Sequence, residues 1–370
     1  MLKRKMGITC SLILLTGCSA PGSPLPTASG GASPHAVTAE YTPGTVSIAP
    51  VIQHAQKAFT ALTLIGTGVA GDTDGAAAQA TLTDPESVAV APDGTVYVAE
   101  PYSYRIRRIA PDGTVSTLAG GGNLPGRTDG VGSQASFMGP SDLALAPDGS
   151  LYVADFDSVR KVTPEGQVTT LTLKNTDGSE YQPIELFGIA LDKSGRLYLS
   201  NTYWIDRVDP DGTVHRFAGE GEKGFADGQG TNAYFNLPRK LAFDGNGNLY
   251  VADYGNQRIR CITPGGTVTT VAGTGILGYV DGPADQSQLN FPMGVACDAS
   301  GDVLISDTYN QAIRELTPDH QVRTIAGNNS AGFADGSGNI QFDRPMGLAV
   351  RADGAIVVAD TENQRIRILK

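Results

Sequence analysis

Histidine, cysteine and tryptophan are scarce in this chain. Its 370 residues include four histidines, four cysteines and one tryptophan. His35 and His54 precede the repeats described below, whereas His215 and His320 lie in or beside outer strands of those repeats. No three histidines can therefore converge on one metal ion, and a zinc site made of histidines is not expected.

Signatures of several enzyme and membrane classes are also missing. The sequence has no Gly-x-Ser-x-Gly motif, so a hydrolase nucleophile on a tight strand-to-helix turn has no support. The apolar run at residues 8–15 is too short to span a bilayer. We predict no catalytic residue and expect no cofactor.

Positive charge is in deficit. The chain has 27 Lys and Arg against 38 Asp and Glu, and three of the basic residues lie at positions 3–5. Without those three, 24 basic residues face 38 acidic ones, which gives a net charge of −14. This balance argues against nucleic acid and against an anionic lipid surface as direct ligands.

The N-terminus resembles an export signal. A basic start at positions 3–5 precedes the apolar run at 8–15 and the small residues before Cys18. A cysteine in this place is similar to that of bacterial lipoprotein signals, which implies a signal at 1–17 and lipidation of Cys18. An ordinary secretory signal with an incidental cysteine is the alternative. Because Asp is absent at positions 19 and 20, the resemblance favours the outer membrane, if the cell has one.

The segment after Cys18 predicts a flexible tether. Residues 21–34 are rich in Pro, Gly, Ser and Ala and have no apolar period, so they cannot bury enough surface to fold. We assign 18–58 to this tether, with one short helix possible at 50–58, and 59–370 to a single folded domain. Cys261 and Cys297 are then the cysteines of the domain, and we expect both to be free thiols, with Cys297 in the core and Cys261 exposed on an outer strand.

One motif recurs through the domain. An apolar strand ends in a carboxylate or amide six times, with spacings of 55, 46, 52, 54 and 53 residues, at Glu100, Asp155, Asn201, Asp253, Asp307 and Asp360. Each copy has a short strand after a proline or glycine, then the strand with the motif, then an Arg-rich third strand. A fourth strand such as residues 267–272 follows. No copy has a helical period.

Four antiparallel strands repeated about every 50 residues predict an all-β fold, a six-bladed β-propeller. The sixth copy lacks its fourth strand because the chain ends at Lys370. Residues 61–75 match 267–282, so a strand near 60–66 should complete the last blade and close the ring. The third strands read as polar outside and apolar inside.

The repeats resemble the NHL repeat family. The resemblance covers about 310 residues and is carried by GNQRIR, YNQAIR and ENQRIR and by Pro238, Pro292, Pro345, Asp253, Asp307 and Asp360. It is strongest in the last three copies, and the second and third lack the Asn-Gln-Arg segment. The resemblance implies a propeller that mostly serves as a binding platform, although a few relatives are enzymes.

The topology places candidate residues on one face, which we call the top. It gathers the starts of the first strands and the ends of the second strands. The carboxylate and amide side chains of the motif suggest one of two roles. They either form a metal site, for which Glu100 and Asn201 are the candidate ligands, or accept hydrogen bonds from backbone N–H groups. The resemblance to lactonase-like propellers supports the metal site, whereas recurrence in every copy favours the structural role.

Charged side chains at the first-strand starts suggest a second site. Glu86 and Asp142 would face Arg239 and Lys240 across a polarised pocket. Alternatively, Arg239 and Lys240 form ion pairs with Asp253 of their own blade. Aromatic residues of the top loops, among them Tyr102, Tyr203 and Trp204, suit glycan or peptide contact or pack on neighbouring blades.

We therefore expect an exported, lipid-anchored binding or interaction scaffold of the cell envelope that is monomeric and touches the membrane only through its lipid. An unknown protein, peptide or glycan would bind on the top face. The alternative is a lyase or lactonase that uses a divalent cation near Glu100 and Asn201.

Overall fold

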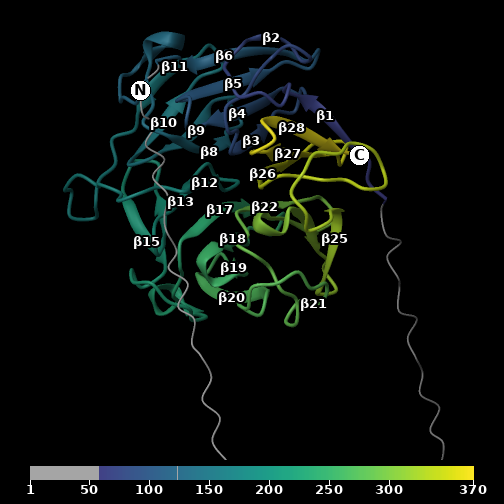
Figure 1. Cartoon of the computed structure of the whole chain (residues 1–370). Coiled ribbons are helices and arrows are strands. Elements are labelled where there is room, and N and C mark those ends of the chain that lie inside the picture. The colour runs from purple at the N-terminus through teal and green to yellow at the C-terminus, as the bar shows by residue number, and fades with distance from the viewer. Residues whose placement is uncertain (1–57, 123) are drawn as a thin grey trace, which may run out of the picture. The chain divides into compact units, whose positions relative to one another are not determined.

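The computed structural model describes residues 58–122 and 124–370 (Figure 1). Gln56–Lys370 form one compact unit. The expected signal, Cys18 and all but the last residue of the tether lie outside the described residues. In the part of the chain that is described, no helix is long and apolar enough to cross a membrane.

Six antiparallel sheets, the blades, follow one another along the chain. Blade 1 has β3 (Ser87–Val90), β4 (Val96–Glu100), β5 (Arg105–Ile109), β6 (Thr114–Gly120) and β2 (Gly75–Ala76). Blade 2 has β8 (Pro140–Leu145), β9 (Leu151–Asp155), β10 (Ser158–Val162), β11 (Gln167–Thr170) and β7 (Gly130–Val131). Blade 3 has β12 (Gly188–Leu191), β13 (Leu197–Ser200), β14 (Ile205–Val208) and β15 (Val214–Ala218).

The remaining three blades repeat the pattern. Blade 4 has β17 (Pro238–Phe243), β18 (Leu249–Asp253), β19 (Arg258–Ile262), β20 (Thr267–Ala272) and β16 (Gly228–Gln229). Blade 5 has β22 (Gly294–Cys297), β23 (Val303–Asp307), β24 (Ala312–Leu316), β25 (Gln321–Gly327) and β21 (Gly282–Pro283). Blade 6 has β26 (Pro345–Val350), β27 (Ile356–Asp360), β28 (Arg365–Leu369) and β1 (Ala61–Ile65). The helical elements are single 3₁₀ turns, η1 (Gly132–Gln134), η2 (Gly230–Asn232), η3 (Tyr254–Asn256) and η4 (Thr308–Asn310).

The blades form a closed ring. The innermost strands β3, β8, β12, β17, β22 and β26 contact one another in that order, and β26 returns to β3 (Figure 1). The predicted six-bladed propeller is therefore confirmed. The sequence did not reveal the two-residue strands β2, β7, β16 and β21, in which each linker adds an edge to the fourth strand of the blade that it enters.

The ring closes where the first strand meets the last. β1 pairs with β28, with Ala61 opposite Leu369, and Thr60 and Lys370 exchange backbone hydrogen bonds of 2.9 and 3.0 Å. The predicted closure of the last blade by an N-terminal strand is confirmed. Blade 6 thus has its full set of four strands.

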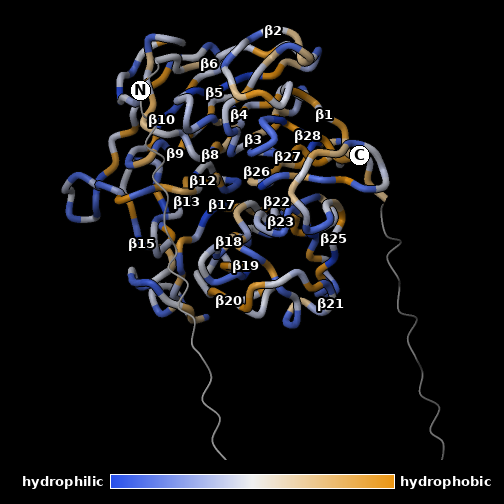
Figure 2. Tube along the Cα trace, in the orientation of Figure 1, coloured by the Kyte–Doolittle hydropathy of each residue, from blue (hydrophilic) through white to orange (hydrophobic). Residues whose placement is uncertain are grey.

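Apolar side chains fill the spaces between neighbouring blades. Successive residues of β4 contact the two neighbours in turn, since Tyr97 and Ala99 pack toward blade 2 whereas Val96 and Val98 pack toward blade 6. Apolar stretches run through the blades (Figure 2). One such cluster joins Ile106 and Phe137 of blades 1 and 2, and another joins Ile313 and Phe342 of blades 5 and 6. Each blade is therefore stabilised mainly by its two neighbours.

The strand register fixes the two faces of the ring. Pro238 at the start of β17 lies opposite Asp253 at the end of β18, and Pro345 and Asp360 pair in the same way. First-strand starts, second-strand ends and the linkers therefore share the top face, as predicted. The opposite, bottom face carries the tight hairpin turns. An Asp in most of these turns accepts a backbone N–H two residues on, as Asp93 does from Thr95 at 2.9 Å.

Both cysteines of the described residues are free thiols, as predicted. Cys297 packs against the apolar cluster between blades 4 and 5, also as predicted. The prediction that Cys261 is exposed was wrong, because this side chain is buried. Arg108 at the equivalent position of blade 1 reaches water through its long side chain, which a cysteine cannot do.

Burial should make Cys261 slow to react. It raises the pKa of the Cys261 thiol to about 11, so the reactive thiolate at pH 8 is depleted about 100-fold relative to an ordinary cysteine. We expect iodoacetamide to label Cys261 of the folded protein about 100-fold more slowly than in denaturant, as measured by peptide mass spectrometry. The rate should rise with pH up to about 11. Fast labelling of the folded protein at pH 8 would contradict the buried position.

Candidate functional site

The motif carboxylates lie beneath the top face and are bound to buried arginines. In blade 4, Arg260 Nη1 donates to Asp253 Oδ2 at 2.8 Å, and Nη2 donates to Asp227 Oδ1 at 2.6 Å. Asp253 also accepts the backbone N–H of Asn236 at 2.9 Å. Blades 1, 2, 5 and 6 repeat this arrangement around Arg107, Arg160, Arg314 and Arg367, all of them fully buried.

This arrangement gives the recurring aspartates a structural role. The carboxylates do accept backbone N–H groups, as the structural alternative predicted, but the central arginine of the third strand in blades 1, 2, 4, 5 and 6 was missed. Reading the third strands as polar outside was wrong, because this arginine points inward between the blades. The Asp of each Asp-Gly linker is also explained, since Asp227 binds both Arg260 and Thr270 of the fourth strand.

The Asn-Gln-Arg segment supplies the remaining contacts at the blade boundaries. Asn256 donates to Asp253, and Gln257 accepts the backbone N–H of Phe291 in the next blade at 2.6 Å. Phe291 has φ +50°, a left-handed conformation unfavourable for a residue with a side chain. The glutamine therefore fixes a strained residue just before the next first strand.

Blade 3 departs from the pattern and inverts the charges. Asp206 takes the place of the buried arginine and Asn201 the place of the aspartate. Asp206 accepts hydrogen bonds from Tyr181 at 2.6 Å, Trp204 at 2.7 Å and Asn201 at 2.9 Å, and Arg216 donates from the fourth strand at 3.3 Å. The Arg216 guanidinium also lies 4.1 Å from the Trp204 ring centroid.

Several predicted site residues are therefore held in the blades rather than at the channel mouth. The Glu100 carboxylate binds Arg107, Ser103 and the backbone N–H of Thr83. Asn201 and Trp204 are occupied by Asp206, and Tyr203 is half-buried in the same loop. No three His, Cys, Asp or Glu residues gather as a metal-binding group among the described residues.

The structure does bring the charged first-strand residues together. Lys240 Nζ donates to Asp142 Oδ1 at 2.8 Å and to the Ser141 carbonyl at 2.9 Å. Asp142 also accepts Ser87 Oγ at 2.7 Å and the backbone N–H of Ile189 at 2.9 Å. Blades 1 to 4 thus meet at one buried ion pair, which we call the channel floor. The alternative prediction, an ion pair of Lys240 with Asp253, was wrong, because Asp253 forms its ion pair with Arg260.

Arg239 lies one position nearer the top than Lys240 and has no such partner. Its guanidinium carbon is 3.8 Å from the ring centroid of Phe187 and 5.0 Å from that of Tyr254. Its Nε is buried without a hydrogen bond, and neither Nη donates to any described residue. Burial lowers the pKa of Arg239, and nearby Tyr254 and Glu86 raise it.

Glu86 is the counterpart of Arg239 on blade 1. Its carboxylate forms no hydrogen bond or ion pair with the described residues, so its distance to Arg239 and Lys240 exceeds 4.0 Å. Burial raises the pKa of Glu86, whereas the charges of Lys240 and Arg239 lower it. The charge of Glu86 in turn raises the pKa of Tyr102.

Aromatic rings complete the mouth of the channel. Tyr254 and Phe291 lie 4.8 Å apart between centroids, and Phe291 and Tyr309 lie 5.2 Å apart. Sequence analysis placed Tyr254 and Tyr309 in the top loops but did not pair Phe187 with Arg239. An aromatic residue at the first-strand start next to an arginine was the available signal. The channel mouth is thus formed by Glu86, Tyr102, Phe187, Arg239, Tyr254 and Tyr309.

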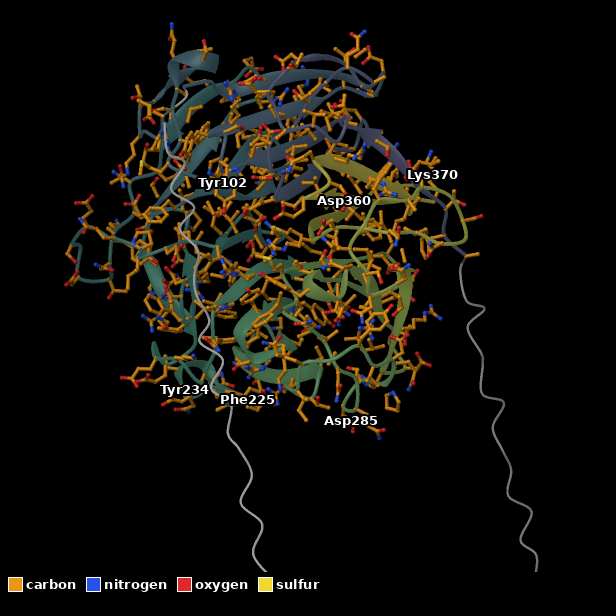
Figure 3. The ribbon with its side chains drawn as sticks, viewed as in Figure 1. Tyr102, Phe225, Tyr234, Asp285, Asp360 and Lys370 are labelled. Carbon is orange, nitrogen blue, oxygen red and sulfur yellow. The ribbon has the colours of Figure 1, made fainter. Side chains whose placement is uncertain are left out.

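A second hollow lies at the side of the ring, away from the channel mouth. It has a volume of about 840 Å³ and is lined by Phe225, Arg258, Asp285 and His320 of blades 4 and 5. Phe225 and Asp285 are at the lower margin of the molecule in Figure 3. The residues at the channel mouth converge from four blades and include opposite charges, so we take the mouth as the candidate site.

Two family models match the sequence. The NHL repeat matches residues 235–262 and 342–369, and the teneurin NHL domain matches residues 123–184. The chain contains NHL repeats. The matched repeats include Asp253, Asp360 and their Asn-Gln-Arg segments, which confirms the resemblance in blades 4 and 6.

Whole proteins are also similar over longer stretches. NHL repeat-containing protein 2 of Bos taurus is 28% identical over 323 residues, 74% of this chain and 44% of that protein. Protein SUPPRESSOR OF QUENCHING 1, chloroplastic, of Arabidopsis thaliana is 29% identical over 282 residues, 66% of this chain and 26% of that protein. The chain spans less than half the length of these relatives.

Solved structures have a fold similar to that of this chain. An auxiliary nutrient binding protein from Bacteroides thetaiotaomicron has a TM-score of 0.65 and 18% identity, covering 84% of this chain and 76% of that one. Virginiamycin B lyase from Staphylococcus aureus has a TM-score of 0.51 and 17% identity, covering 84% and 99%. At such identities the likeness establishes the fold alone.

Proposed function

We propose that this protein is a non-enzymatic binding protein of the cell envelope, anchored through lipidated Cys18, whose peptide or protein partner docks on the top face. The observation that carries the proposal is the uneven distribution of exposed apolar side chains. Every large one among the described residues except Leu62 and Val131 lies in a linker between blades or in a loop between a second and a third strand: Val69, Tyr102, Leu124, Phe156, Ile184, Phe225, Ile276, Leu277, Val280, Tyr309 and Phe333.

The exposed fractions are large at the tips of these linkers. Leu124 is 77% exposed, Ile184 67% and Ile276 62%. The bottom turns carry Asp, Gly, Pro and Asn instead, and within the described chain none has an exposed large apolar side chain. Apolar surface gathered on one face of a soluble domain marks an interaction site, and aromatic residues such as Tyr102 and Tyr309 are enriched in interface cores.

The alternative of a metal-dependent lyase or lactonase receives less support from the site. Glu100 and Asn201, its expected ligands, bind Arg107 and Asp206 instead. Virginiamycin B lyase shares the fold, and fold does not fix function. The two named ligands would have to leave buried partners before they could bind a cation.

Substitutions on the top face should weaken peptide binding. We expect peptides selected from a random library on the mature protein to lose at least about tenfold in affinity to an Ile184→Asp, Ile276→Asp variant, because charge is introduced into apolar contact surface. The matched control is Ala299→Asp, Ala352→Asp, which adds the same charge to exposed bottom turns. Fluorescence polarisation measures both. Equal binding by the top variant, or loss only in the bottom variant, would refute the proposed face.

A further inference from the structure

Arg239 is flanked by two aromatic rings. Its guanidinium carbon lies 3.8 Å from the centroid of the Phe187 ring and 5.0 Å from that of the Tyr254 ring. Aromatic neighbours restrict the orientation of a guanidinium, and a carboxylate matches its fork of donors with two parallel hydrogen bonds. Among the residues that the structure describes, nothing accepts from those donors.

The other charges around Arg239 and Glu86 mostly have partners. Lys240 and Asp142 bind each other, Asp84 accepts from Gln364 Nε2 at 2.6 Å, and Arg344 binds Glu362 at 2.9 Å. Glu185, a residue of the linker that enters blade 3, is a further acid whose charge raises the pKa of Arg239. Glu86 and Arg239 are therefore left as opposite charges on blades 1 and 4, which face each other across the six-bladed ring.

Leaving two half-buried charges more than 4.0 Å apart and unpaired is costly, unless a ligand comes between them. A simple anion would bind Arg239 but meet the Glu86 carboxylate in an acidic domain. A simple cation would bind Glu86 but meet Arg239. A molecule with a carboxylate at one end and an ammonium at the other would satisfy both groups.

We propose that the channel mouth binds a free amino acid or short peptide as a zwitterion, with its carboxylate on Arg239 and its ammonium on Glu86. The channel floor of Lys240 and Asp142 closes the site below. Tyr102, Tyr254 and Tyr309 surround the ligand, where their rings and hydroxyl groups suit both apolar and polar side chains. This inference rests on the proposed function, because it names the chemistry recognised on the same top face.

Blocked ligands test the proposal on the unaltered protein. Calorimetric titration of the mature protein with glycyl-phenylalanine is compared with its N-acetyl form and its C-terminal amide. Each block removes one charge-assisted contact, so each should weaken binding by about 10- to 100-fold. Equal affinity for all three forms, or no heat of binding from the free dipeptide at millimolar concentration, would overturn the proposal.

Two substitutions assign the two ends. Arg239→Gln should abolish the preference for the acid over the amide yet keep the preference for the free amine. Glu86→Gln should do the reverse. A structural role for either residue would weaken all ligands alike, so this crossed pattern separates recognition from folding. Arg351→Gln, on a bottom turn, is the control and should bind like the unaltered protein.

The two levels of the hypothesis fail differently. If library peptides still depend on Ile184 and Ile276 but are insensitive to blocked termini, the zwitterion site is wrong and the top-face partner stands. If the dipeptide binds with the crossed pattern while the top-face variant has no effect, the site stands and the apolar rim is not the docking surface. If no variant weakens the binding of library peptides or of the dipeptide, both the top-face docking surface and the zwitterion site are wrong.

Discussion

Replacing Arg260 with methionine is expected to lower the free energy of unfolding by about 3–5 kcal/mol. The substitution leaves Asp253 fully buried without its counter-charge and removes partners from Asp227 and from the Tyr234 and Ala226 carbonyls. Burial already raises the pKa of Asp253, and Arg260 is the charge that opposes this effect. Urea denaturation followed by circular dichroism measures the change.

Arg207→Met provides the matched control for Arg260. It is also an arginine on a third strand, but it is partly exposed and pairs with Asp209 at 3.1 Å on the surface. Exposed ion pairs contribute at most about 1 kcal/mol, so the free energy of unfolding of this variant should be close to that of the unaltered protein. If the two substitutions cost the same, the buried arginines do not stabilise the blades as described.

Replacing Asp206 with alanine is the second change expected to have a large effect, a loss of about 3 kcal/mol in the free energy of unfolding. It removes the shared acceptor of Tyr181, Asn201 and Trp204, and buried donors without partners cost about 1–3 kcal/mol each before relaxation. Because Trp204 is the single tryptophan, its fluorescence should change in the folded state as well. Urea denaturation gives the stability.

Asp209→Ala is the control in the same blade. Asp209 is half-buried and pairs with Arg207 and His215 at the surface, so its loss should cost less than about 1 kcal/mol and leave the Trp204 emission unchanged. A smaller effect at Asp206 than at Asp209 would show that the inverted network of blade 3 contributes little.

The repeats predicted the fold because each copy carries its own turns, strand lengths and apolar alternation. Blade number and strand order follow from the spacing of Asp253, Asp307 and Asp360, and the strand that completes the last blade follows from the match of residues 61–75 to 267–282. These features are local or periodic, so a single sequence contains them. The burial of Arg260 was missed because an arginine between two aliphatic residues looks the same whether it faces water or a neighbouring blade.

The candidate site was predicted only in part. Glu86, Asp142, Arg239 and Lys240 were singled out as exceptions among repeated positions, and the structure brings them together. Sequence analysis offered two partners for Lys240, the acids of blades 1 and 2 or Asp253 of its own blade, and could not choose between them because the choice depends on which side chains reach across the ring. Lys240 reaches Asp142 of blade 2 rather than Asp253 of its own blade. Asn201 and Trp204 were exceptions too, but both donate hydrogen bonds to Asp206 within blade 3.

The strand that closes the ring has a consequence for how the protein is made. Ala61 and Leu369 are paired although 308 positions separate them, so β1 leaves the ribosome long before β28 exists. Until β28 is made, β1 and β27 have unpaired edges, which are templates for aggregation. Ring closure is therefore a late step that depends on the complete chain, and early release of a truncated chain would leave an open ring rather than a smaller stable one.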